Sequence, residues 1–157
     1  MRIIKPKPSD IRSCVRIHTL CDYGNTKNIK EAEKLTFNYI RKGMANNDCI
    51  YLMAKSDFEA IGFASFIYDK WNNSILIDQL FVRPDMQGRG IGSKLLRRAL
   101  EKAKKMGVRI AFLHTGKSNN NAITFYKKNG FSVAGQIKVL YGHDTESDAI
   151  VLSYKLR

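Results

Sequence analysis

Apolar and polar residues recur with two different spacings along this chain of 157 residues. Apolar residues at every third or fourth position predict amphipathic helices, whereas short alternating or continuous apolar runs between turn residues predict strands. The helical spacing covers residues 8–20, 28–44, 91–106 and 119–128. The strand pattern covers residues 50–55, 60–68, 74–82, 108–115, 131–141 and 149–156. Strands mixed with helices in this way predict an α/β (α+β) fold with a mixed central sheet.

Turn residues separate these segments. Ser56-Asp57 joins the first two predicted strands as a hairpin, Gly107 follows the third helix as a C-cap, and Asn129-Gly130 closes the fourth helix. The chain carries no internal repeat or low-complexity linker, and its length is typical of one compact unit. We therefore expect residues 1–157 to form a single domain.

The chain is strongly basic. It has 27 Lys and Arg residues against 14 Asp and Glu residues, which gives a net charge of +13. Such a charge favours anionic partners, including nucleic acids and membrane surfaces. However, the charges are spread along the whole chain, and the cations of the helix at 91–106 lie opposite an apolar stripe, as on any solvated helix. Without a nucleic-acid-binding signature, we expect no specific nucleic acid partner.

Membrane, disulfide and metal chemistry are not indicated. No apolar run is long enough to span a bilayer, and the first residues lack the apolar region of a signal peptide, so a cytoplasmic protein is expected. The three cysteines, Cys14, Cys21 and Cys49, are odd in number and lack metal-ligand spacing. They predict neither a disulfide framework nor a metal site.

The segment from Gln87 to Gly92 is the most informative motif. It reads Gln-Gly-Arg-Gly-Ile-Gly and stands between the predicted strand at 74–82 and the helix at 91–106. Backbone N–H groups at a helix N-terminus attract phosphate, and glycines let the backbone approach a ligand closely. The spacing matches neither the Walker loop nor the dinucleotide fingerprint. It predicts a pyrophosphate-binding loop, although an ordinary strand-to-helix turn would also contain glycines.

A second motif, Asn-Asn-Asn-Ala-Ile-Thr-Phe-Tyr-Lys-Lys-Asn-Gly-Phe, occupies residues 119–131. Together with residues 80–92, it resembles the GNAT superfamily of acetyl-CoA-dependent N-acetyltransferases. The glycine loop matches Gln/Arg-x-x-Gly-x-Gly/Ala, and the second motif matches Asn-x-x-Ala-x-x-x-Tyr followed by Gly-Phe. The resemblance implies a mixed sheet whose fourth and fifth strands splay apart to form the acetyl-CoA cleft.

The resemblance also assigns acetyl-CoA-binding residues. It implies that pantetheine pairs with the strand at 80–82, that pyrophosphate lies on the loop amides, and that Asn119 binds near the pantetheine or acetyl group. Asn119 would equally serve as the N-cap of the following helix. The implied cofactor-binding residues are Leu80, Phe81, Val82, Gln87, Gly88, Arg89, Gly90, Ile91, Gly92, Ser93, Asn119 and Tyr126.

Acetyl transfer needs a neutral amine and an acid that protonates the departing thiolate. Tyr126 matches the family's general acid, and a phenol and a thiol differ by about 1.5 pKa units, or about 2 kcal/mol. For the base, His114 and Asp78 are candidates. An imidazole can accept a proton near neutral pH, although related ribosomal-protein acetyltransferases hold a glutamate near the position of His114. A structural role explains either residue equally well.

The resemblance predicts an acyltransferase that joins acetyl-CoA and a primary amine in a ternary complex, without an acetyl-enzyme. The acceptor, a small molecule or a peptide, would contact residues 23–27 and 141–148, where the acidic residues of the second segment could attract a cationic amine. A homodimer is also compatible with the family. Two alternatives are an acetyl-CoA-binding module without catalysis and a basic protein associated with ribosomes or nucleic acid.

Overall fold

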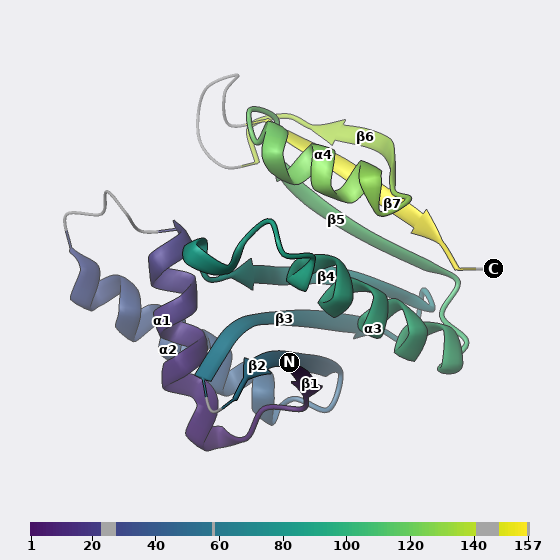
Figure 1. Ribbon diagram of the computed structural model, residues 1–157. Helices are drawn as coiled ribbons and strands as arrows, with labels where there is room; N and C mark the ends of the chain where they lie inside the picture. Colours follow the sequence, from purple (N-terminus) through teal and green to yellow (C-terminus); the bar gives the residue numbers. More distant parts are fainter. Residues whose placement is uncertain (23–27, 58, 141–147, 157) are drawn as a thin grey trace. The chain divides into compact units, whose positions relative to one another are not determined.

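The computed structural model describes residues 1–22, 28–57, 59–140 and 148–156. Within them the chain forms a seven-stranded mixed sheet and four α-helices, which confirms the predicted fold class (Figure 1). The strands follow the order β1-β2-β3-β4-β5-β7-β6 across the sheet. Their bounds are Arg2–Ile4 (β1), Cys49–Ser56 (β2), Glu59–Asp69 (β3), Ser74–Val82 (β4), Ile110–Gly116 (β5), Ser132–Ile137 (β6) and Ala149–Lys155 (β7). The helices are Ile11–Asp22 (α1), Ile29–Ala45 (α2), Ile91–Lys105 (α3) and Asn120–Lys128 (α4).

The chain divides into two compact units. The first contains residues Met1–Tyr68 and Ile77–Glu101, and the second contains Asp69–Leu76 and Lys102–Arg157. Strand β4 and helix α3 therefore contribute residues to both units. None of the helices in the described ranges is long and apolar enough to cross a membrane.

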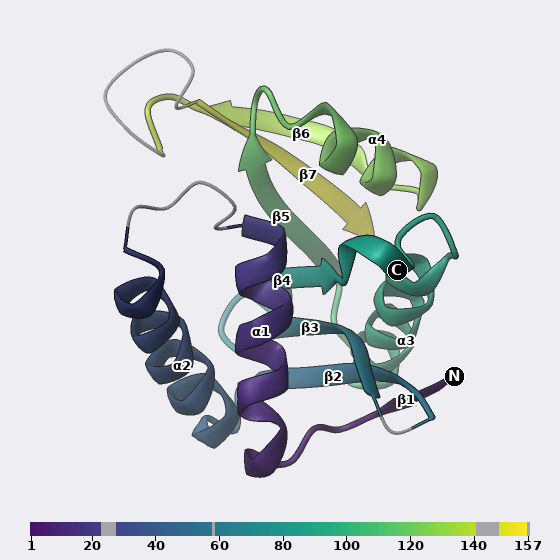
Figure 2. The same ribbon diagram turned by 60° about the vertical axis from the view of Figure 1, so that its left-hand side comes forward.

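In the first unit, α1 and α2 cover one face of β2, β3 and β4 (Figure 2). Their apolar stripes meet the strands in a cluster of buried residues that includes Cys14, Ile17, Ile40, Met53 and Phe63. The other face carries α3, which buries the stripe that its sequence spacing predicts. The buried residues of this stripe in the first unit are Ile91, Leu95, Leu96 and Ala99. Helices thus cover both faces of these strands.

In the second unit, β5 pairs antiparallel with β7 from Ile110↔Lys155 to Gly116↔Ala149, and β7 pairs antiparallel with β6. The first residues of β4, Ser74–Leu76, pair parallel with β5. Helix α4 begins at the N-cap Asn119 and ends before Gly130, whose φ of +89° suits a helix stop.

The sequence pattern missed β1 and placed the end of β6 too late. The sequence pattern gave no strand at β1, which is only three residues long and gains its register by pairing with β2. The predicted strand at 131–141 ends earlier, at Ile137, because Val139 adopts a positive φ of +48°. The Asp148 carboxylate accepts a hydrogen bond from the Val139 N–H at 2.9 Å and so holds this turn.

Candidate functional site

The glycine loop lies at the end of β4, where the sequence predicts it. Gly88 and Gly90 both have φ of +74°, a left-handed conformation that side chains with a Cβ rarely adopt. A Cβ built on either glycine would meet no described atom within 4 Å. Conformation, rather than crowding inside the fold, therefore requires glycine at these positions. The space above the loop is open, as close approach of a ligand requires.

Side-chain hydrogen bonds hold the loop in shape. The Gln87 amide donates to the carbonyl oxygen of Val82 at 3.0 Å, and the Arg89 guanidinium donates to the Asp85 carbonyl at 3.4 Å. Arg83 donates to the Asp85 carboxylate, and this contact lowers the pKa of Asp85. The Gln87 and Arg89 side chains therefore donate to nearby backbone carbonyls, and their expected contact with the cofactor stays a prediction. The first N–H groups of a helix have no intrahelical acceptor, so those of α3 are the candidate donors to an anion.

Side chains of β3 contact side chains of β4. The Ser65 hydroxyl donates to the Asp78 carboxylate at 2.8 Å, and the rings of Phe63 and Phe81 lie 5.7 Å apart. The Ser65 hydroxyl also lies 3.3 Å from the amide oxygen of Gln79. These contacts fix Asp78 and Phe81 against β3.

The end of β4 is also anchored to α1. The carbonyl oxygen of Val82 accepts from the Cys21 thiol at 3.2 Å and from Gln87. A carbonyl oxygen has two lone pairs, so this acceptor is fully used. Any ligand that pairs with the strand here has to use other backbone groups of residues 80–82.

Asp78 lies at the centre of a hydrogen-bonded cluster in the first unit. Its carboxylate accepts from the Tyr39 hydroxyl at 2.7 Å and from the Ser65 hydroxyl at 2.8 Å. Burial, followed by the bond to Asp78, raises the pKa of Tyr39, so this phenol remains a donor. Asp78 forms no ion pair with the described part of the chain. A cationic ligand could therefore still neutralise its charge.

His18 is a neighbour of β4 that the sequence analysis missed. Its ring packs edge-on against Phe81, with centroids 4.6 Å apart, and burial lowers its pKa. The imidazole is therefore neutral at pH 7. The contact joins residues far apart in the sequence, so no local spacing could have predicted it.

In the second unit, Tyr126 is only 7% exposed and packs edge-on against Phe125 and Phe131. Burial alone raises the pKa of its phenol. Its hydroxyl forms no hydrogen bond with the described residues, and it is not one of their fully enclosed unsatisfied groups. The phenol is therefore protonated and has a hydrogen bond to offer to a ligand.

The segment before Tyr126 contains the other two candidates of this unit, Asn119 and His114. Asn119 accepts from the Ala122 N–H at 3.1 Å as the N-cap of α4, and its amide donates to the Thr115 hydroxyl at 3.2 Å. His114 lies one residue earlier on β5, with an exposed side chain, opposite Val151. The N-cap role of Asn119 is thus present, and Thr115 fixes its orientation.

The expected acceptor segments fall largely beyond what the structure describes. Residues 23–27 and 141–147 lie outside the described residues. Within the second acidic segment only Asp148 is described, and it accepts from the Val139 N–H and the Gln136 amide. These bonds lower the pKa of Asp148 and give the residue a structural role.

The sequence resembles those of known acetyltransferases. The model of the acetyltransferase (GNAT) family matches residues 13–131. An uncharacterized N-acetyltransferase of Methanocaldococcus jannaschii is 48% identical over 62 residues, which are 40% of this chain and 27% of the relative. Streptothricin acetyltransferase of Streptomyces lavendulae is 32% identical over 91 residues, which are 58% of this chain and 48% of the relative. The chain thus spans less than half the length of these two relatives.

A solved structure extends the likeness in fold to nearly the whole chain. PaiA N-acetyltransferase from Thermoplasma acidophilum, in complex with coenzyme A, aligns over 98% of both chains with a TM-score of 0.80 and 20% identity. At that identity the likeness shows the fold. The family model, however, matches most of the sequence and includes both motifs. The chain therefore belongs to the acetyltransferase (GNAT) family.

Proposed function

We propose that this protein transfers an acetyl group from acetyl-CoA to a primary amine by direct attack in a ternary complex. The observation that carries the proposal is the loop after β4, where two left-handed glycines leave open space in front of the α3 N-terminus. Family membership and a fold relative crystallised with coenzyme A support it. The predicted single domain, cytoplasmic location and homodimer remain proposals.

The candidate acetyl-CoA-binding residues fall in both units. In the first unit, the N–H groups of residues 88–93 would bind pyrophosphate, because they combine free donors with the positive end of a helix dipole. Pantetheine would pair with backbone groups of residues 80–82 other than the Val82 carbonyl, which already accepts two hydrogen bonds. In the second unit, Asn119 would bind near the pantetheine or acetyl group.

The chemistry requires the acceptor nitrogen to lose two protons and the sulfur to gain one. The ammonium form of the acceptor gives its first proton to a base, the neutral nitrogen forms a bond to the acetyl carbon, and its second proton passes to solvent as the amide forms. The carbon–sulfur bond breaks, and the sulfur takes a proton from the Tyr126 hydroxyl, which solvent replenishes. Burial raises the pKa of Tyr126, so the phenol is fully protonated at neutral pH but is a weaker acid than an exposed one. Its contribution is a directed hydrogen bond that completes proton transfer as negative charge builds on sulfur.

Asp78 and His114 remain the candidate bases. Asp78 has two neutral hydroxyl donors and no ion pair in the described residues, which suits it to attract an ammonium group. His114 is exposed beside the segment that positions Asn119. The variants Asp78→Asn and His114→Gln distinguish the two candidate bases. Only the variant that removes the true base should lower kcat by about a hundredfold or more.

An acetyl-CoA-binding module without catalysis is the second candidate. The hydrogen bonds from Tyr39 and Ser65 favour this alternative, because they already satisfy the Asp78 carboxylate and so give it a structural role instead of a role as a base. Saturable CoA binding without thiol release against any amine would support this alternative.

Initial-velocity kinetics test the proposed order of events. A panel of a polyamine, an aminoglycoside, a free amino acid, a peptide N-terminus and a peptide lysine first identifies an acceptor by thiol release. Acetyl-CoA and that acceptor are then varied together. A ternary complex predicts intersecting double-reciprocal lines, whereas parallel lines would indicate an acetyl-enzyme and contradict direct attack.

A further inference from the structure

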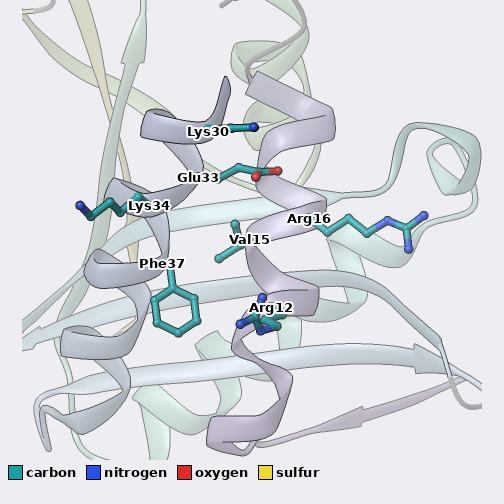
Figure 3. A pocket seen from close by; sticks show the side chains of 7 residues that line it. All are labelled: Arg12, Val15, Arg16, Lys30, Glu33, Lys34 and Phe37. Carbon is teal, nitrogen blue, oxygen red and sulfur yellow. The ribbon is translucent and has the colours of Figure 1, made fainter. Parts of the chain in front are cut away.

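A pocket lies between α1 and α2 in the first unit (Figure 3). Its volume is about 370 Å³, within the range of small-molecule sites. It contains none of the residues proposed to bind acetyl-CoA. The lining residues are Arg12, Val15, Arg16, Lys30, Glu33, Lys34 and Phe37.

The pocket combines an apolar floor with a charged rim. Figure 3 shows Val15 and Phe37 between the two helices, with Lys30 and Glu33 extending from α2 toward α1, whereas Arg16 and Lys34 extend outward in opposite directions. Val15 is buried and Phe37 is partly buried, so the floor belongs to the packed interface of α1 and α2. An occupant of this pocket therefore has to present apolar surface as well as charge.

The rim has a large excess of positive charge. Arg12 and Arg16 are four residues apart on α1, and Lys30 and Lys34 are four residues apart on α2, so each pair brings like charges together. Glu33 is the one carboxylate in the lining. None of the four cations forms an ion pair with the described part of the chain. Elsewhere in the same unit, Lys55 and Arg83 do pair with carboxylates.

We propose that this pocket binds a small organic anion that carries an apolar body. Its negative groups would pair with the arginines and lysines, and its apolar part would cover Val15 and Phe37. Arginine suits this role, because its planar donors match the oxygens of carboxylate, sulfonate or phosphate groups. A bare inorganic anion would leave the floor uncovered. A second copy of the chain is disfavoured, because two molecules of charge +13 would place their basic rims face to face.

Calorimetric titration with naphthalene disulfonate, an aromatic dianion, tests the proposal. The wild-type protein is expected to bind it at one site, and the double variant Arg12→Gln/Arg16→Gln to bind about tenfold more weakly or worse. Lys104→Gln/Lys105→Gln is the matched control, because it removes the same charge from exposed positions on α3. This control is expected to bind within about twofold of wild type. Phe37→Leu, which keeps the floor apolar but removes the ring, should weaken binding about threefold.

Four results would overturn the proposal. They are no saturable binding of the dianion, an equal loss of affinity in the two double variants, unchanged affinity in Phe37→Leu, and competition by inorganic sulfate as strong as by the dianion itself. A short single-stranded oligonucleotide serves as a separate arm. If the oligonucleotide competes with the dianion and binds more tightly than the dianion does, the surface is a nucleic acid interface instead. Thermal unfolding of each variant confirms that the fold is retained.

Discussion

Replacing Tyr126 with Phe separates a catalytic hydroxyl from a structural one. The ring packs against Phe125 and Phe131, and Phe would keep both contacts. The hydroxyl has no partner among the described residues, so its removal breaks no internal hydrogen bond that the structure contains. We therefore expect the free energy of unfolding to change by less than about 0.5 kcal/mol.

The effect on catalysis should be much larger. A positioned general acid contributes about 10²- to 10⁴-fold to the rate, which corresponds to about 3–5 kcal/mol of transition-state stabilisation. Tyr126→Phe should therefore lower kcat by at least about a hundredfold while the Kd for CoA stays within about threefold. Because burial raises the pKa of Tyr126, the wild-type rate should show no loss from phenol ionisation between about pH 6 and pH 9.

Thiol release measures kcat, calorimetry measures the Kd for CoA, and urea denaturation measures stability. Tyr154→Phe is the matched control, because Tyr154 is another ring of the same aromatic cluster, 5.3 Å from Phe131. The control should match wild type in all three measurements. The reasoning is refuted if Tyr126→Phe retains kcat within about twofold, or if it loses more than about 1.5 kcal/mol of stability, the cost of a broken internal hydrogen bond.

Three further predictions concern the glycine loop, His18 and Asp10. Gly88→Ala and Gly90→Ala should each weaken CoA binding about tenfold, because Ala resists a φ of +74°, whereas Gly135→Ala on exposed β6 should not change it. Burial lowers the pKa of His18 below 6.5, so stability should fall as the pH drops below 6.5, by at most about 1.4 kcal/mol per pH unit, and urea denaturation of His18→Gln should lack this slope. The hydrogen bond from Lys55 lowers the pKa of Asp10 below 3.8. Its stabilisation is therefore present above pH 3.8 and lost below it, and Asp10→Asn should abolish that part of the acid sensitivity of the melting temperature.

Local signals were enough to predict much of the fold. Strand β4, Ser74–Val82, has the predicted bounds, because an apolar run there ends at Arg83-Pro84. Helix α4 begins after the predicted cap Asn119, whose side chain forms the expected bond to the helix backbone. Both elements are defined by neighbours within a few residues, where sequence patterns are informative.

Contacts between distant residues explain what the sequence analysis missed. The early end of β6 depends on Asp148, which binds the backbone of Val139 nine residues earlier. Prediction of the site from the sequence has the same limit. Asp78 was a candidate from its position, but its partner Tyr39 comes from a helix 39 residues away, and only packing brings the two together. The loop motif predicts where an anion would bind, yet gives no sign that Gln87 turns inward to Val82.

The central claim is that the glycine loop binds acetyl-CoA for transfer to an amine. Calorimetric titration of the protein with CoA, followed by thiol release from acetyl-CoA in the same preparation, tests it most directly. The account predicts saturable binding of one CoA per chain and thiol release with at least one class of primary amine. Absence of CoA binding by the folded protein would contradict it.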